Sequence, residues 1–264
     1  AGDEAPDEQL APAPGAEIAL RGATFGTAVH DMLEHADFGA WPAPDEPLSE
    51  ANRQHVEKYL RGAGLALPEG RPRATLLEQV GGLIGACLHT ELPGIGPLAA
   101  VPAEHRVAEM EFMLGLGGPR LDRVLALLRD HGYATGLPES RQREALAGLM
   151  NGYIDLTVEA DGRYFVIDYK TNDLGADPAA YRGERLQRAV TDAHYDLQYL
   201  IYCVALHRHL RHRLPGYDPE THLGGVHYLF LRGMRGGEAP DGVFTDRPPA
   251  ALITALDATL GGEA

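Results

Sequence analysis

With 264 residues, 44% of them hydrophobic and 23% charged, the chain has the size and composition of one large globular domain, with or without a helical appendage. Its two cysteines, Cys87 and Cys203, are far apart and in no CxxC motif, which excludes a disulfide framework and an iron-sulfur cluster and favours a cytoplasmic location. No long apolar run or secretory signal is present, so we expect no membrane partner, and the net charge of −15 argues against a general sheath of non-specific DNA contacts.

Residues 1–17 are rich in Ala, Pro, Asp and Glu and contain no basic side chain before Arg21. A segment of this composition has too little apolar surface to fold, so it predicts a solvated acidic linker. We therefore expect one folded domain over 18–264, and the linker indicates that the chain is a piece of a longer polypeptide.

The apolar spacing along the rest of the chain predicts helices that alternate with a few strands. The helix expected over 49–60 has Ser49 as its N-cap, and Gly132 closes the helix expected over 121–131. Further helices are expected over 24–38, 75–89, 178–190, 194–213 and 249–260, and strands over 107–116, 153–159, 163–170 and 224–231. This order predicts an α/β fold with a mixed central sheet flanked by helices and additional N-terminal helices.

The two middle strands are predicted to form a β-hairpin, because Asp161-Gly162 between them is a strong signal for a two-residue turn. Such a turn pairs Ala160 with Arg163. The same register places Asp155 opposite Asp168, with Lys170 two residues further along on the same face. The other face would carry the apolar side chains that pack on a core, which are Ile154, Leu156, Val158, Phe165 and Ile167.

Two carboxylates at one rung of a sheet repel each other, so Asp155 and Asp168 indicate a cation that offsets the repulsion. A hard divalent ion with oxygen ligands, Mg²⁺ or Mn²⁺, fits best. A solvent-facing polar surface is the alternative. Against it, only two of the 23 basic residues are lysines, Lys58 and Lys170, and one of them lies at this point. A compact ammonium can orient a water or contact a phosphate oxygen, which favours a functional site.

An Asp followed on the neighbouring strand by Asp-x-Lys resembles the motif of the PD-(D/E)xK nucleases, with Ile154 in place of the motif's proline. The segments 26–30, 168–172, 195–199 and 224–233 resemble, more narrowly, the nuclease domain of the RecB family. This resemblance implies a restriction-endonuclease-like core. It also implies a Mg²⁺-dependent deoxyribonuclease of the exodeoxyribonuclease V type, with endonuclease activity on single-stranded DNA.

The resemblance further implies a role for each residue of the centre. The ligands of a Mg²⁺ ion, which Mn²⁺ can replace, would be His30, Asp155, Asp168 and the backbone carbonyl of Tyr169. Lys170 would lie beside the attacking water and add positive charge where the phosphate oxygens become more negative.

Three further residues are implied to support this centre. Gln198 and Tyr202 lie one helical turn apart on a shared face, where they either touch DNA or the metal-bound water or simply pack on the hairpin. Glu111 is a weaker candidate for an outer carboxylate.

Arginines gather between 181 and 213 in this acidic chain. They can follow a phosphate backbone, or they can form a charged helix face that keeps the protein soluble. The candidates for DNA contact are Arg182, Arg185, Arg188, Arg208 and Arg211.

By resemblance, the partners are single-stranded DNA delivered by a helicase, the helicase portion of RecB, RecC, RecD and RecA. A catalytically silent DNA-guiding or protein-docking module of the same fold is the alternative, which the retained Asp155, Asp168, Lys170 and His30 disfavour. A free-standing nuclease of the superfamily, such as a resolvase or a phage exonuclease, is disfavoured by the acidic linker and by the continuous similarity to RecB.

Overall fold

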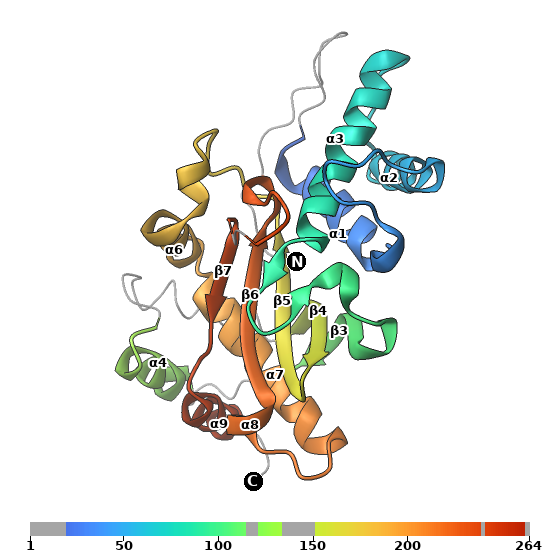
Figure 1. Ribbon diagram of the computed structural model, residues 1–264. Helices are drawn as coiled ribbons and strands as arrows, with labels where there is room; N and C mark the ends of the chain where they lie inside the picture. Colours follow the sequence, from blue (N-terminus) through green and yellow to red (C-terminus); the bar gives the residue numbers. More distant parts are fainter. Residues whose placement is uncertain (1–19, 115–120, 134–150, 239–240, 262–264) are drawn as a thin grey trace.

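The computed structural model describes residues 20–114, 121–133, 151–238 and 241–261 (Figure 1). A five-stranded mixed sheet lies at its centre, in the order β3-β4-β5-β6-β7. The strands are β3 (Arg106–Met113), β4 (Asn151–Ala160), β5 (Arg163–Lys170), β6 (Leu223–Phe230) and β7 (Val243–Asp246). The predicted linker over 1–17 lies outside the described residues, so its boundary at residue 18 stays a prediction.

Strands β4 and β5 form the predicted hairpin. Ala160 pairs with Arg163 and Leu156 with Ile167, which is the expected register. Asp161 and Gly162 both have positive φ, 50° and 74°, as a type I′ turn requires. The local turn chemistry therefore determines which residues of the two strands face each other.

The parallel pairing of β5 with β6 requires a long crossover between them. This connection contains a 3-10 turn, η5 (Pro178–Tyr181), and the helices α6 (Gly183–Asp192), α7 (Tyr195–Arg213) and α8 (Pro219–His222). The single helix predicted over 178–190 is wrong, because Arg182 adopts an extended conformation and separates η5 from α6. Strand β7, which was not predicted, pairs antiparallel with β6 and forms the far edge.

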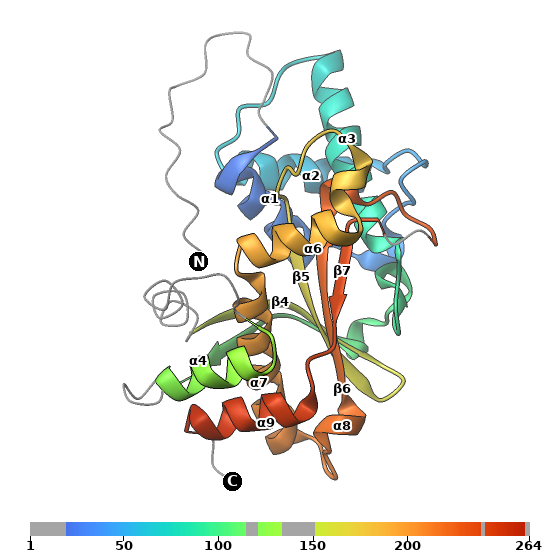
Figure 2. The same ribbon diagram turned by 90° about the vertical axis from the view of Figure 1, so that its left-hand side faces the viewer.

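One face of the sheet is covered by α7 together with α6, α4 (Leu121–Asp130) and α9 (Ala250–Thr259). Figure 2 shows α4 and α9 next to each other on this side, below α6. Helix α7 packs between the sheet and α9, and most of its residues from Asp196 to His207 are buried, whereas its C-terminal end is largely exposed.

The other face is covered by the N-terminal helices α1 (Gly22–Glu34), α2 (Glu50–Gly62) and α3 (Arg71–Leu88). Helix α2 begins as predicted, with the Ser49 hydroxyl accepting a hydrogen bond of 3.1 Å from the Asn52 amide. Helix α1 ends at Glu34 rather than at 38, because a separate 3-10 turn, η1 (Phe38–Ala40), follows it. Its predicted apolar stripe is buried: Phe25, Val29, Met32 and Leu33.

Short elements join α3 to the sheet. They are β1 (Glu91–Leu92), β2 (Gly96–Pro97), η2 (Leu98–Ala100) and η3 (Ala103–His105). Strand β3 ends at Met113, three residues before the predicted end at 116, and residues 115–120 lie outside the described part. Within the described residues, no helix has the length and apolarity needed to cross a membrane.

The hairpin buries apolar side chains on both faces rather than on one. Leu156, Val158, Phe165 and Ile167 pack towards α1–α3 as predicted, but Ile154 packs on the α7 side. The prediction that Ile154 shares their face is therefore wrong. The alternation of faces assumes a regular strand, but the pairing of β4 with β3 is interrupted here: Glu109, between the pairs Ala108–Leu156 and Met110–Ile154, is unpaired in the ladder and has a left-handed φ of 48°. Asp155 lies on β4 at this irregularity.

Candidate active site

The candidate site lies where the pairing of β4 with β5 ends. The last paired rung is Leu156–Ile167, and Asp155 and Asp168 come immediately after it. Instead of continuing the backbone ladder, the Asp155 carboxylate accepts a hydrogen bond of 2.8 Å from the Tyr169 amide. The hairpin thus presents two acidic side chains at the point where α1 and α7 approach from opposite faces of the sheet.

Asp168 and Lys170 form a buried ion pair on β5. Lys170 Nζ lies 2.7 Å from Asp168 Oδ2, and Asp168 is 2% exposed. Burial raises the pKa of Asp168 to about 6, although the Lys170 ammonium opposes the shift. Burial lowers the pKa of Lys170, but the nearby carboxylates, Asp168 foremost, outweigh it and the net shift is upward. Lys170 is therefore a fixed positive charge.

Helix α1 contributes His30 to the other carboxylate. His30 Nδ1 lies 3.3 Å from Asp155 Oδ2, so His30 lies beside the centre to which the resemblance assigned it. Burial lowers the pKa of His30, yet the Asp155 charge raises it to about 9 overall. Burial likewise raises the pKa of Asp155, but His30 and Lys170 shift it below its ordinary value. In the protein by itself, the imidazolium provides the positive charge that balances Asp155.

Helix α7 supplies Gln198 and Tyr202. Gln198 Oε1 accepts hydrogen bonds from Lys170 Nζ at 3.1 Å and from the Tyr228 hydroxyl at 2.8 Å. The Tyr202 ring packs against Phe112, and burial raises the pKa of its hydroxyl, which also interacts with Gln198. Gln198 is therefore a direct neighbour of the site lysine, while its catalytic contribution stays a prediction.

Two tyrosines that the sequence reasoning did not select enclose the lysine. Lys170 Nζ lies 4.1 Å from the centre of the Tyr195 ring and 5.1 Å from that of Tyr228. Their π faces stabilise the ammonium and restrict its position. Both belong to segments that carry the resemblance, 195–199 and 224–233. Their position within these segments was therefore the sequence feature that could have identified them as site residues.

Strand β3 carries two carboxylates near the site, Glu109 and Glu111. Glu111 lies opposite Tyr153, with 3.5 Å between Glu111 Oε1 and the tyrosine hydroxyl. Glu109 instead lies beside Asp155, and its pKa is raised by burial and by the Asp155 charge. A supporting role for Glu111 stays a prediction. Glu109 was missed because a left-handed residue inside a strand breaks the alternation from which faces are read.

The predicted DNA-contacting arginines divide into two groups. Arg182 pairs with Asp241, and Arg185 Nη1 lies 2.7 Å from Asp177 Oδ2, both on the exposed surface. Arg208 and Arg211 both contact the buried Asp257 of α9. Exposed Arg188 lies next to Arg185 along a shallow pocket of α6. Arg208 and Arg211 of α7 thus link this helix to α9.

A family model described as the PD-(D/E)XK nuclease superfamily matches residues 7–251. This match spans nearly the whole chain, and the described fold is the expected α/β sheet with helices on both faces. The chain therefore belongs to the PD-(D/E)XK nuclease superfamily.

Within that superfamily, the chain is similar to curated RecBCD enzyme subunits named RecB. It is 36% identical to that of Escherichia coli over 244 residues, which are 92% of this chain and 19% of RecB. It is 37% identical to that of Haemophilus influenzae over 90% of this chain and 18% of RecB. It is 33% identical to that of Mycolicibacterium smegmatis over 97% of this chain and 26% of RecB. The chain thus spans about a fifth to a quarter of the length of these relatives, and it matches their nuclease domain.

Nucleases of this superfamily use divalent metal ions, and the side chains at this site differ in how well they suit one. In the described part of the chain, no three His, Cys, Asp or Glu side chains converge at metal-binding spacing. The donors are nevertheless suitable: Asp168 Oδ2 is buried without a hydrogen bond of regular geometry, and Asp155 contacts His30 and the Tyr169 amide. Two carboxylates that rely on side-chain cations for balance fit a divalent ion.

Proposed function

We propose that the chain is the Mg²⁺-dependent deoxyribonuclease domain of a RecB-type helicase-nuclease. It would hydrolyse phosphodiester bonds of single-stranded DNA, with endonuclease activity and Mn²⁺ as an alternative cofactor. The observation that carries this proposal is the buried Asp168–Lys170 pair at the end of β5, one strand away from Asp155. A carboxylate pair beside a fixed ammonium is the chemistry that phosphodiester hydrolysis needs.

The residues would divide the work as follows. The metal ligands would be Asp155, Asp168, His30 and the Tyr169 carbonyl, and the bound ion would lower the pKa of a coordinated water. Lys170 would orient the attacking water and stabilise the negative charge on the phosphate oxygens. Gln198 and Tyr228 would hold the Lys170 ammonium in place, with Tyr202 and Glu111 further out. Because the Asp168–Lys170 pair is buried in a low-dielectric environment, its electrostatic interactions are stronger than they would be in water.

The partners follow from the relatives, whose name places RecB in the RecBCD enzyme. We infer that the chain works beside a RecB helicase portion, RecC and RecD, in the cytoplasm, during double-strand-break processing and recombinational repair. RecA is proposed as a further partner by resemblance. On the DNA side, Arg182, Arg185 and Arg188 are proposed to approach the phosphate backbone. Arg208 and Arg211 were proposed with them but are engaged with Asp257.

The test is cleavage of circular single-stranded DNA by the chain in Mg²⁺ or Mn²⁺. Wild type is compared with Asp168→Asn and Lys170→Ala, and Asp161→Asn in the exposed hairpin turn serves as the matched control. We expect metal-dependent nicking in wild type and in the control, and none in the two site variants.

The docking-module alternative makes the opposite prediction. A folded wild type that neither cleaves DNA nor changes its thermal unfolding on addition of Mn²⁺ would support that alternative and contradict the nuclease assignment.

A further inference from the structure

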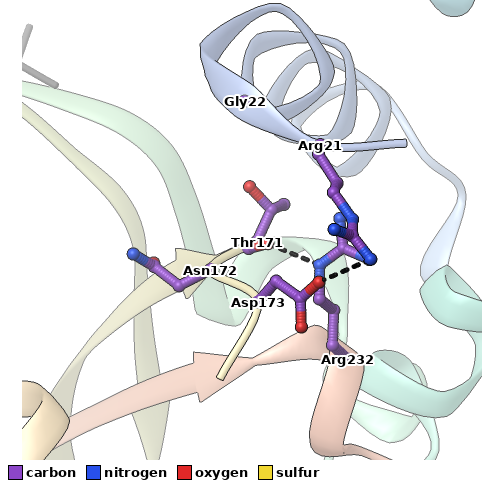
Figure 3. A pocket seen from close by; sticks show the side chains of 6 residues that line it. All are labelled: Arg21, Gly22, Thr171, Asn172, Asp173 and Arg232. Carbon is purple, nitrogen blue, oxygen red and sulfur yellow. Dashed lines mark hydrogen bonds and ion pairs between the residues drawn. The ribbon is translucent and has the colours of Figure 1, made fainter. Parts of the chain in front are cut away.

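A small pocket lies beside the end of β5. It is lined by Arg21, Gly22, Thr171, Asn172, Asp173 and Arg232, with a cavity of about 170 Å³. This volume is several times that of one water molecule, about 30 Å³ in the liquid, and is sufficient for a phosphate group. In Figure 3, Arg21 from the N-cap of α1 and Arg232 from the 3-10 turn η6 (Leu231–Gly233), which follows β6, extend towards each other beside Asp173. We call this cavity the Arg21–Arg232 pocket.

The pocket is built from the same elements as the candidate active site. Thr171, Asn172 and Asp173 directly follow Lys170, and consecutive Cα atoms are about 3.8 Å apart. Helix α1, which carries His30, begins at the pocket. A DNA strand whose phosphate reaches Lys170 therefore has a neighbouring phosphate within reach of the pocket.

The charge of the pocket is positive in an otherwise acidic protein. Arg232 Nε donates a 2.7 Å hydrogen bond to the Thr171 carbonyl, and its Nη2 donates to the Leu20 carbonyl. Among the described residues, no carboxylate pairs with Arg232, so its charge is not neutralised. Arg21 Nη2 lies 3.1 Å from Asp173 Oδ2. The pocket thus contains two guanidinium groups and one carboxylate, and that carboxylate pairs with Arg21.

The two arginines differ in mobility. Arg232 is half-buried, and its two backbone acceptors and the nearby Phe25 ring fix its orientation. The Arg21 side chain is 73% exposed and has one ion-pair partner, so it can reorient at little cost. A fixed and a movable guanidinium are suited to grip a phosphate, because the planar group binds two oxygens at once.

We propose that the Arg21–Arg232 pocket binds a phosphodiester group of the DNA strand next to the one that is cut. The inference rests on the proposed function and deepens it. Asp173 holds Arg21 while DNA is absent and repels the incoming phosphate, so the carboxylate weakens DNA binding. Removal of Arg21 and removal of the Asp173 charge should therefore change DNA affinity in opposite directions, which a simple surface ion pair does not predict.

The first test measures binding of a fluorescent single-stranded oligonucleotide by anisotropy, which does not depend on cleavage. Arg21→Gln should weaken binding roughly threefold to tenfold and reduce the salt slope by about 0.7, the value for one lost single-strand phosphate contact. Asp173→Asn should strengthen binding, and its amide oxygen can still accept from the Gly175 amide as Asp173 does. The matched control is Arg61→Gln on α2, an exposed arginine paired with Glu57.

The signs of these changes decide the proposal. A purely structural ion pair predicts that Arg21→Gln and Asp173→Asn act in the same direction, because both break one contact. Equal or parallel effects of the two variants, or affinities unchanged in both, would overturn the pocket while leaving wild-type cleavage intact. Loss of wild-type cleavage alone would instead count against the proposed function.

A second measurement locates the phosphate. Neutral methylphosphonate linkages are placed one at a time along the oligonucleotide. We expect one position, near the cut, where neutralisation weakens binding by wild type but has no further effect on Arg21→Gln. Additive losses at every position would contradict a contact between this arginine and a DNA phosphate.

Discussion

Gln198 on α7 and Lys170 on β5 are joined by a 3.1 Å hydrogen bond across the sheet–helix boundary, and the same glutamine oxygen accepts from Tyr228. A long, flexible lysine side chain is thereby fixed by four partners: a carboxylate, an amide oxygen and two aromatic rings. The hydrogen bond connects Lys170, the residue proposed to act on the phosphate, with helix α7, which covers one face of the sheet.

Replacing Gln198 by Leu should reduce kcat roughly tenfold to a hundredfold, the range for lost outer-shell partners, with a smaller effect on KM. The physical reason is that Lys170 loses the acceptor that orients it. The measurement is steady-state cleavage of single-stranded DNA together with thermal unfolding. Gln187→Leu on the exposed side of α6 is the matched control, and equal losses in both variants would refute the positioning role.

Lys170→Arg should abolish most of the activity although it keeps the charge. The Lys170 side chain is only 12% exposed and is enclosed by Asp168, Gln198 and two tyrosine rings. A planar guanidinium does not fit this space without displacement, and a misplacement of about 1 Å can cost about a hundredfold in rate. The other lysine provides the control, since Lys58→Arg on exposed α2 should leave cleavage unchanged. Retention of more than a tenth of the wild-type rate in Lys170→Arg would contradict this prediction.

Acid should destabilise the protein through His227. This side chain is 1% exposed on β6, and burial lowers its pKa to about 4. The folded state therefore binds fewer protons than the unfolded state between the two pKa values. The stability that neutral His227 contributes is complete above pH 6.5 and is lost as the pH falls towards 4, a change of about 3 kcal/mol.

The measurement for His227 is the free energy of unfolding in urea from pH 7.5 to pH 4. His227→Gln removes the titrating group. The free energy of unfolding of wild type should therefore fall by about 3 kcal/mol more than that of the variant between pH 7.5 and pH 4. Parallel pH profiles would show that His227 does not carry the effect.

Asp257 should contribute to stability and not to DNA binding. It is 2% exposed on α9, where it accepts from Arg208, from Arg211 at 2.9 Å and lies 3.7 Å from His207 of α7. Asp257→Asn leaves two guanidinium groups without a charge partner and should lower the free energy of unfolding by about 2 kcal/mol or more. Urea unfolding measures this loss. DNA affinity should change less than about twofold, whereas clearly tighter binding would show that the freed arginines reach DNA.

The hairpin and its carboxylates follow from the sequence by itself. The Asp161-Gly162 turn and the alternation of side chains act over a few residues, so the register that brings Asp155 and Asp168 to one end of the ladder is a local property. The sequence by itself also shows that Lys170 is the single lysine of that strand, and its apolar spacing predicts the order of helices and strands. These features sufficed to predict the α/β fold class and to select Asp155, Asp168 and Lys170 as candidates, whereas His30 was selected by the family resemblance.

Other relationships were decided by tertiary packing. His30 lies 125 positions before Asp155, and only the seating of α1 on the sheet brings them within 3.3 Å. The same applies to Gln198 beside Lys170, and to the arginines of α7, whose pattern in the sequence suits DNA but whose partner is a carboxylate on α9. Glu109 was missed and Ile154 was assigned to the wrong face because prediction from alternation assumes regular strands, and the β3–β4 ladder is interrupted at Glu109, which has a left-handed backbone. The spacing of residues in the sequence specifies local geometry, whereas the pairing of distant side chains depends on how whole helices pack and on which charges that packing buries together.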